Sequence, residues 1–159
     1  MSSTTRAATT PELIDPRGQR FAAAVTSVLL ALVLILGPAL GLPVLIVQTL
    51  AFGAGSILGL KYQPWGWIFR TAVRPRLGAP RELEDARPPR FAQTVGLIFG
   101  LAALLGAVAG LPVLFYLATG FALVAALLNA IFDFCLGCEI YLMGKRPLGD
   151  GADTSRATT

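Results

Sequence analysis

The sequence predicts an all-α membrane protein with four transmembrane helices, arranged as two repeated helical hairpins, with both termini in the cytoplasm. Hydrophobic residues make up 55% of the chain and charged residues 14%, whereas a soluble domain is about one quarter charged. Residues 21–60 and 91–132 contain no Lys, Arg, Asp or Glu. Because one spanning helix needs about 20 apolar residues, each block is long enough to cross a bilayer twice.

Each apolar block is interrupted once, by Gly-Pro-Ala-Leu-Gly-Leu-Pro at residues 37–43 and by Gly-Ala-Val-Ala-Gly-Leu-Pro at residues 106–112. Gly and Pro are unfavourable inside helices and common in turns, so both stretches are predicted to connect antiparallel helices. The predicted spans are residues 20–36, 44–60, 91–105 and 113–134. The first three are short, which suits a thin bilayer or flanking Arg and Lys side chains that reach the headgroups.

The two hairpins are predicted to be copies of one unit. Five residues of the first copy, Asp15, Arg17, Arg20, Phe21 and Ala22, recur as Asp85, Arg87, Arg90, Phe91 and Ala92. The sequence Gly-Leu-Pro-Val-Leu also occurs twice, at residues 41–45 and 110–114. A two-helix unit returns the chain to its starting side, so both copies are expected to have the same orientation in the membrane.

The distribution of positive charge predicts that orientation. All thirteen Lys and Arg residues lie in the N-terminal segment, in residues 61–90 or in the C-terminal segment, and the two predicted hairpin turns have none. Positively charged loops are retained in the cytoplasm. This accounts for the basic central segment without a nucleic-acid partner, although anionic lipid is an alternative ligand. Trp65 and Trp67 place residues 61–70 along the membrane surface.

The predicted organisation is one transmembrane domain between two tails. Its parts are a disordered tail at residues 1–13, a transmembrane domain at 14–143 with hairpins at 20–60 and 90–134 and a cytoplasmic interfacial segment at 61–89, and a second disordered tail at 144–159. A cleaved signal peptide at residues 21–41 is disfavoured, because the apolar stretch is long and further spans follow. The protein is expected in the lipid bilayer of the cell membrane.

The residues able to carry chemistry are few. The chain has no histidine, which removes the usual haem ligand, the commonest metal ligand and the most frequent general base. We therefore predict no cofactor and no metal site. Cys135 and Cys138 are the only cysteines and form Cys-Leu-Gly-Cys, a candidate redox dithiol. Because cytoplasmic disulfides are normally reduced, the pair is expected to cycle transiently.

Acidic residues flank this dithiol. Asp133 and Glu139 are expected to disfavour the thiolate by like charge, Asp133 more strongly because it lies deeper. A position at the C-terminal end of the fourth span disfavours the thiolate as well. The pair is thus predicted to be a resolving or acceptor dithiol. Two alternatives are a pair of small apolar residues at a helix end and half of a zinc site. Asn129, one turn before Asp133, is a further candidate polar group.

Four motifs carry a resemblance to a known family. They are Asp-Pro-Arg-Gly-x-Arg-Phe at residues 15–21, Pro-Arg-Leu-Gly at 75–78, Pro-Arg-Phe-Ala-Gln at 89–93 and Cys-Leu-Gly-Cys at 135–138. Over residues 14–143 the chain resembles the small bacterial membrane proteins classed as domain of unknown function 4395. That resemblance implies a four-helix membrane protein without an established activity. It also implies a link to sulfur or thiol metabolism, because the relatives often occur beside thioredoxin-like and rhodanese-like sulfurtransferase proteins.

Together these observations predict a membrane thiol protein. Cys135 and Cys138 are expected to exchange electrons or sulfane sulfur with a soluble thioredoxin-like or rhodanese-like partner, with Asp133 and Glu139 as tuning residues. A non-enzymatic scaffold or anchor that binds a partner through residues 61–90 is the alternative. A small-solute transporter is a third hypothesis, which the low polarity of the spans disfavours. Homo-oligomerisation is left open.

Overall fold

The structure, a computed structural model, describes residues 12–80 and 82–145. In chain order the elements are β1 (Leu13–Ile14), α1 (Pro16–Leu40), α2 (Leu42–Gly53), the π-helical turn η1 (Ala54–Leu58), the 3₁₀ turn η2 (Leu60–Tyr62), α3 (Pro64–Ile68), the π-helical turn η3 (Phe69–Val73), α4 (Arg74–Leu77), β2 (Glu84–Asp85), α5 (Arg87–Val108), α6 (Pro112–Phe132) and α7 (Leu136–Lys145). The all-α prediction is confirmed. The predicted tails lie outside the described residues, except at their inner edges, where Leu13 belongs to β1 and α7 runs to Lys145.

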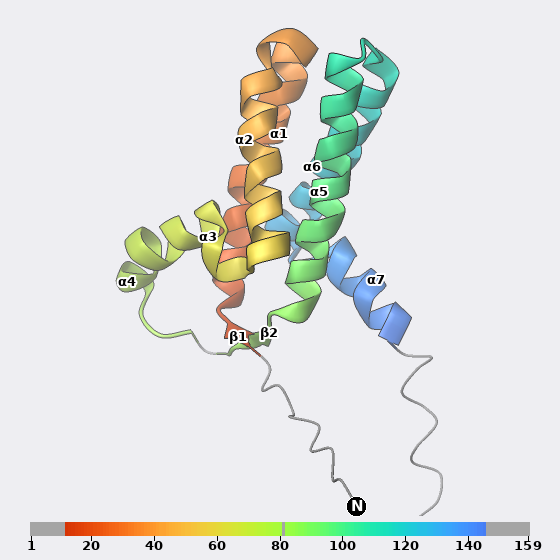
Figure 1. Cartoon of the computed structure of the whole chain (residues 1–159). Helices are drawn as coiled ribbons and strands as arrows, with labels where there is room; N and C mark the ends of the chain where they lie inside the picture. The colour runs from red at the N-terminus through yellow and green to blue at the C-terminus, as the bar shows by residue number, and fades with distance from the viewer. Residues whose placement is uncertain (1–11, 81, 146–159) are drawn as a thin grey trace, which may run out of the picture.

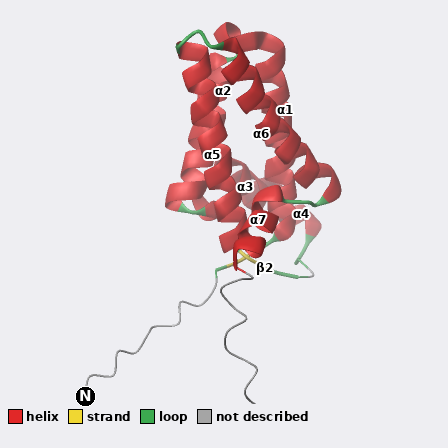
Figure 2. Ribbon diagram, turned by 90° about the vertical axis from the view of Figure 1, so that its right-hand side faces the viewer, coloured by secondary structure: helices red, strands yellow, loops and turns green. Residues whose placement is uncertain are grey.

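The four long apolar segments form two antiparallel hairpins that lie side by side (Figure 1). α1 packs on α2 and α6, and α5 likewise packs on α2 and α6, so each helix of one hairpin contacts a helix of the other. The hairpin turns lie at one end of the bundle. At the opposite end lie α3, α4, α7 and the short β1–β2 pair, in which Leu13 pairs with Asp85 (Figures 1 and 2).

Three helices in the described part of the chain are long and apolar enough to cross a membrane: α1 with 25 residues, α5 with 22 and α6 with 21. The fourth apolar segment, Leu42–Leu58, is shorter. Large apolar side chains cover the outside of the bundle, such as Ile35, which is 80% exposed, and Val108, which is 78% exposed. A surface of this kind is stable in lipid and unstable in water, which indicates a membrane protein.

The glycine and proline stretches lie at the two hairpin turns. A kink at Gly37 (φ 74°, ψ −178°), directly before Pro38, interrupts the helical backbone of α1 near its C-terminal end. The second turn contains Gly110, with φ 68°, immediately before α6. Both glycines have a positive φ, a conformation that side chains with a Cβ adopt at a cost. These turns therefore depend on glycine in the positions that the sequence marks.

Two arginines join the hairpins at the other end of the bundle. Arg90, at the start of α5, donates to the carbonyl oxygens of Ser56 at 2.8 Å and Ile57 at 2.9 Å, in the last turn of the first hairpin. Arg20, in α1, donates to the carbonyl oxygen of Ala130 at 3.4 Å, in the last turns of α6. Each arginine thus supplies hydrogen bonds to carbonyl groups that a helix end leaves unpaired. In each case the carbonyl groups belong to the other hairpin.

A buried polar side chain connects the bundle to the interfacial segment. Gln48 of α2 is fully buried, donates to the Thr26 hydroxyl of α1 at 3.1 Å and accepts from Trp65 Nε1 of α3 at 3.2 Å. A polar group buried in an apolar interior is stable only when its hydrogen bonds are made. Gln48 therefore fixes the position of α3 against α1 and α2.

The charged residues of the same end hold the interfacial segment to α1. Asp15 accepts from the backbone N–H of Arg17 at 3.0 Å, and it forms ion pairs with Arg17 at 3.0 Å and Arg74 at 4.0 Å. The hydrogen bond from Arg17 lowers the pKa of Asp15, so this carboxylate is ionised at neutral pH. Arg17 also donates to the carbonyl oxygen of Gly78 at 3.1 Å. The basic segment is thereby part of the folded domain.

Candidate functional site

The segment that carries the cysteines leaves the membrane helix earlier than its apolar sequence predicts. α6 ends at Phe132, and Asp133 adopts the left-handed conformation with φ 57° and ψ 23°. Asp is one of the few residues that tolerate this conformation. The predicted continuation of the fourth span to residue 134 is therefore wrong. The chain makes a sharp turn at Asp133, and Phe134 donates its backbone N–H back to Leu128 at 3.3 Å.

Cys135 is the residue immediately before the next helix, α7. Its carbonyl oxygen accepts the backbone N–H of Glu139 at 3.0 Å, so Cys135 caps the N-terminus of α7 and Cys138 lies in the first turn. The prediction that both cysteines lie at the C-terminal end of a helix is also wrong. Because α7 directs unpaired N–H groups and the positive end of its dipole at Cys135, the local field favours a thiolate. This is the reverse of the predicted electrostatic environment.

The two thiols are in different states. The Cys138 thiol donates a hydrogen bond to Cys135 Sγ, which also accepts from the backbone N–H groups of Cys138 and Gly137, and these bonds lower the pKa of Cys135 to about 7. The same thiol–thiol hydrogen bond, together with partial burial, raises the pKa of Cys138. Both cysteines are half-buried and unbridged. At neutral pH the Cys135 thiol is therefore partly ionised, and the Cys138 thiol keeps its proton.

The acidic neighbours differ from those that the sequence predicts. The charge of Glu139 raises the pKa of both cysteine thiols, and the charge of Glu84, on β2, raises that of Cys138. Asp133 instead points toward Arg20, with 3.8 Å between its carboxylate and the guanidinium, and its side chain is 61% exposed. Glu84 was not predicted, because its place near Cys138 depends on the β1–β2 pairing. The tuning role of Asp133 stays a prediction.

Gly137 explains how α7 reaches the bundle. A Cβ atom at this position would lie 2.6 Å from the Cα atom of Ala92 on α5 and 2.7 Å from its Cβ atom. Only a residue without a side chain allows so close an approach of the two backbones. One turn further along α7, the ring of Tyr141 lies 5.9 Å from the ring of Phe91. The dithiol is thereby pressed against the start of α5.

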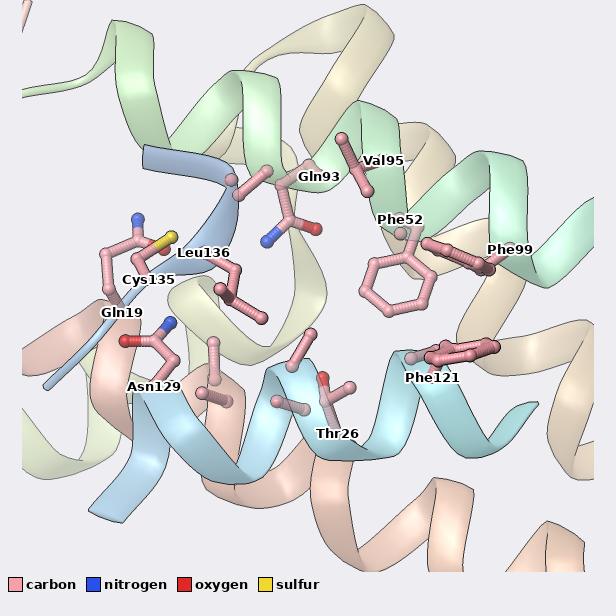
Figure 3. Close-up of a pocket in the computed structure, with 18 of the residues that line it drawn as sticks. Gln19, Thr26, Phe52, Gln93, Val95, Phe99, Phe121, Asn129, Cys135 and Leu136 are labelled. Atoms are coloured by element: carbon pink, nitrogen blue, oxygen red, sulfur yellow. The ribbon is translucent and has the colours of Figure 1, made fainter. Parts of the chain in front are cut away.

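A cavity of about 290 Å³ lies between the two hairpins, and the Cys135–Gly137 segment forms part of its wall (Figure 3). A large part of the remaining wall comes from small residues on three helices. These residues are Ala22 and Ala23 on α1, Ala92 and Gly96 on α5, and Ala122, Ala125 and Ala126 on α6. The cavity exists because side chains this small leave the space between the helices unfilled.

The ends of this cavity differ in chemistry (Figure 3). Cys135 lies toward the same end as the Gln19 and Asn129 amides, whereas Phe52, Phe99 and Phe121 lie toward the other. The rings of Phe99 and Phe121 are 6.2 Å apart. The Gln93 amide also lines the cavity, and its Oε1 atom is buried without a hydrogen-bond partner. Asn129 was a candidate polar group from the sequence, but the cavity was not predicted. The sequence feature that could have indicated the cavity is the helical spacing of its alanine, glycine and amide residues.

The chain was compared with known protein families, curated proteins and solved structures. Residues 14–146 match the family described as Domain of unknown function (DUF4395). The chain belongs to this family. No curated protein and no solved structure matches it.

In this DUF4395 chain the four motifs that carry the resemblance meet at one end of the bundle. The Asp15–Arg17 pair contacts Gly78 of the second motif, and Ala92 of the third contacts Gly137 of the fourth. Among residues 12–80 and 82–145, no group of three or more His, Cys, Asp or Glu side chains is placed to hold a metal ion. Residues of the first, third and fourth motifs line the cavity.

Proposed function

We propose that this chain is a four-span protein of the bacterial plasma membrane that exchanges electrons or sulfane sulfur with a soluble thioredoxin-like or rhodanese-like protein. Cys135 is the attacking residue and Cys138 the resolving residue. The observation that carries the proposal is the position of Cys135 at the N-terminus of α7, with Cys138 in the first turn of the same helix. A thiol with a pKa close to ambient pH combines a large thiolate fraction with good nucleophilicity.

The exchange has two steps. In the first, the Cys135 thiolate attacks a disulfide of the partner, so that a mixed disulfide forms and one partner thiolate leaves. In the second, Cys138 loses its proton and attacks Cys135 Sγ, which closes the Cys135–Cys138 disulfide and releases the second partner thiolate. Two electrons thus pass from this chain to the partner, and the reverse sequence returns them. With a persulfide donor, Cys135 accepts the outer sulfur atom instead and becomes a persulfide.

The proposed topology places this site in the cytoplasm. Leu42–Leu58, the second segment in chain order, completes the set of four spans and is shorter than the other three. At about 1.5 Å per residue its 17 residues extend about 25 Å, slightly less than the hydrocarbon core of about 30 Å. The described Lys and Arg residues all belong to segments at the end of the bundle that also holds α7, and the hairpin turns carry none. The positive-inside rule assigns that end to the cytoplasm.

Trapping of the mixed disulfide tests the proposal. Cys138→Ser leaves Cys135 without its resolving thiol, so a soluble thioredoxin-like or rhodanese-like protein should remain linked to it after mild oxidation. Cys135→Ser is the matched control, because it keeps one thiol in the same turn and should trap nothing. The double variant Cys135→Ser with Cys138→Ser, once it is shown to insert normally, should form no adduct. Cells that carry it should behave like cells that lack the protein. If partner binding and phenotype survive in the double variant, a scaffold that binds through residues 61–90 is the better account.

A further inference from the structure

We propose that the cavity beside Cys135 binds the ring of a lipid-soluble quinone, which accepts the two electrons of the Cys135–Cys138 dithiol. The inference rests on the thiol function proposed above and supplies its missing electron acceptor. With a quinone in this place, the chain transfers electrons from soluble dithiols in the cytoplasm to the quinone pool of the membrane.

The location and size of the cavity support a ligand that arrives from the bilayer. Its volume of about 290 Å³ is at the lower end of the range for small-molecule sites, about 300–1,000 Å³. Apolar side chains form most of its surface, and Phe121, at the end away from the dithiol, is 60% exposed on the outside of the bundle. A ring inserted between the hairpins therefore has a route for its apolar tail into lipid at that end.

The polar groups of the cavity fit a ligand that is neutral in both redox states. Within the described part of the chain, no Asp, Glu, Lys or Arg side chain lines the cavity, and none of the amides of Gln19, Gln93 and Asn129 has a side-chain hydrogen bond. An anionic ligand would lose its hydration there without compensation. An acyl chain would leave the amides without hydrogen-bond partners. An amide both donates to a quinone carbonyl and accepts from a quinol hydroxyl.

The reaction balances without any other group. The Cys135 thiolate and the Cys138 thiol form one S–S bond and together release two electrons. The two ring oxygens of the quinone receive those electrons and two protons, one from Cys138 and one from water in place of the proton that Cys135 has already lost, and the product is the quinol. The contact of Cys135 with the cavity places the donor sulfur beside the ring. A soluble dithiol then reduces the Cys135–Cys138 disulfide by the exchange described above.

Anaerobic oxidation of the full-length protein in nanodiscs tests the quinone site. The probe is decylubiquinone, whose ring carbons are all substituted, so a thiol has no open ring position for addition. The reduced protein should form one quinol per Cys135–Cys138 disulfide, measured by quinone absorbance and by mass spectrometry. In Cys138→Ser, the Cys135 thiolate should give a long-wavelength charge-transfer band with the quinone, and Cys135→Ser should give none.

Cavity-filling variants make the test specific. Ala23→Leu and Ala125→Leu place side-chain volume in the cavity from two different helices, α1 and α6, and each should slow quinol formation about tenfold, as a loss of about 1.4 kcal/mol in binding would. Ala24→Leu is the matched control, because Ala24 is the next residue on α1 and is exposed. It should react like the wild type. All three variants should keep the wild-type rate with glutathione disulfide, which shows that the dithiol itself is intact.

The outcomes separate the two proposals. A wild-type dithiol that reacts with glutathione disulfide but reduces no quinone overturns the quinone site and leaves the exchange function standing. The quinone site is overturned as well if native mass spectrometry finds only lipid acyl chains bound, or if the cavity variants and Ala24→Leu reduce quinone equally fast. Quinone reduction without any mixed disulfide with a soluble protein has the opposite meaning. It upholds the quinone site and overturns the proposed exchange.

Discussion

Gly137 packs directly against the backbone of Ala92, and this contact joins the dithiol to the second turn of α5. The space between the two residues admits no Cβ atom, because the nearest Ala92 atom would be 2.6 Å away. The glycine of the Cys-Leu-Gly-Cys motif therefore sets the position of α7, and with it the hydrogen bonds that stabilise the Cys135 thiolate. Other residues at this position are expected to move the helix without removing either thiol.

Gly137→Ala tests this relationship. The added methyl group forces α7 away from α5 at a cost of about 1–3 kcal/mol in stability, weakens the hydrogen bonds to Cys135 Sγ and raises the pKa of that thiol. The rate of iodoacetamide alkylation at Cys135 between pH 5 and 9 measures the pKa. Gly144→Ala, on the same helix with nothing within 4 Å of its added Cβ, is the matched control and should leave the profile unchanged. Identical profiles for the two variants would show that the Ala92 contact does not position the dithiol.

The hydrogen bond from Cys138 is the largest contribution to the lowered pKa of Cys135. Cys138→Ala removes the donor, so the pKa of Cys135 should rise from about 7 toward its ordinary value. Cys138→Ser keeps a donor and should raise it less. Because alkylation requires the thiolate, the wild-type rate should fall as the pH is lowered through about 7, and the Cys138→Ala profile should lie at higher pH. Superimposable serine and alanine profiles would rule out this hydrogen bond as the cause.

Neutralising Glu139 and Asp133 one at a time should show which of them has the larger effect on the pKa of Cys135. The charge of Glu139 raises the pKa of the Cys135 thiol, so Glu139→Gln should lower that pKa and speed alkylation at pH 6. Asp133→Asn should act more weakly, because the Asp133 carboxylate is exposed and faces Arg20. This order is the reverse of the one expected from sequence. A larger effect of Asp133→Asn in the same alkylation assay would restore Asp133 as the main tuning residue.

Cysteine labelling tests the proposed topology. In a background without Cys135 and Cys138, single cysteines at Ala39 and Ala109, which are exposed at the hairpin turns, should react with a membrane-impermeant maleimide in intact cells. A cysteine at Ala79, exposed at the other end of the bundle, should react only after permeabilisation. Labelling of Ala79 from outside would invert the orientation and place the dithiol in an oxidising compartment.

The sequence predicts the hairpins well because their signals are local. The charge-free blocks and the Gly–Pro stretches depend only on neighbouring residues, and the helices and turns follow them. The end of α6 was placed wrongly because Phe134 and Leu136 continue the apolar pattern past Asp133. A single left-handed residue at Asp133 changes the helix end on which the cysteines lie, and with it the sign of the dipole effect.

The cavity was missed for a different reason. Its small residues come from three helices, and each alanine by itself is ordinary in a membrane span. Only the register between the hairpins shows that Ala23, Gly96 and Ala126 face the same space. The contacts that fix this register, such as Gly137 against Ala92 and Arg90 on Ser56, join residues far apart in the chain. Such pairings follow from three-dimensional packing and not from periodicity.

The reciprocal arginine contacts affect how the protein is made. When the ribosome has released only the first hairpin, the carbonyl groups of Ser56 and Ile57 still lack the guanidinium of Arg90, which is more than 30 residues further along the chain. The end of α6 likewise receives its hydrogen bond from Arg20, which was synthesised long before. Insertion of the first hairpin therefore leaves an incomplete helix end that the second hairpin finishes. Two halves of the chain, translated as separate polypeptides, carry the complementary groups needed to assemble in the bilayer.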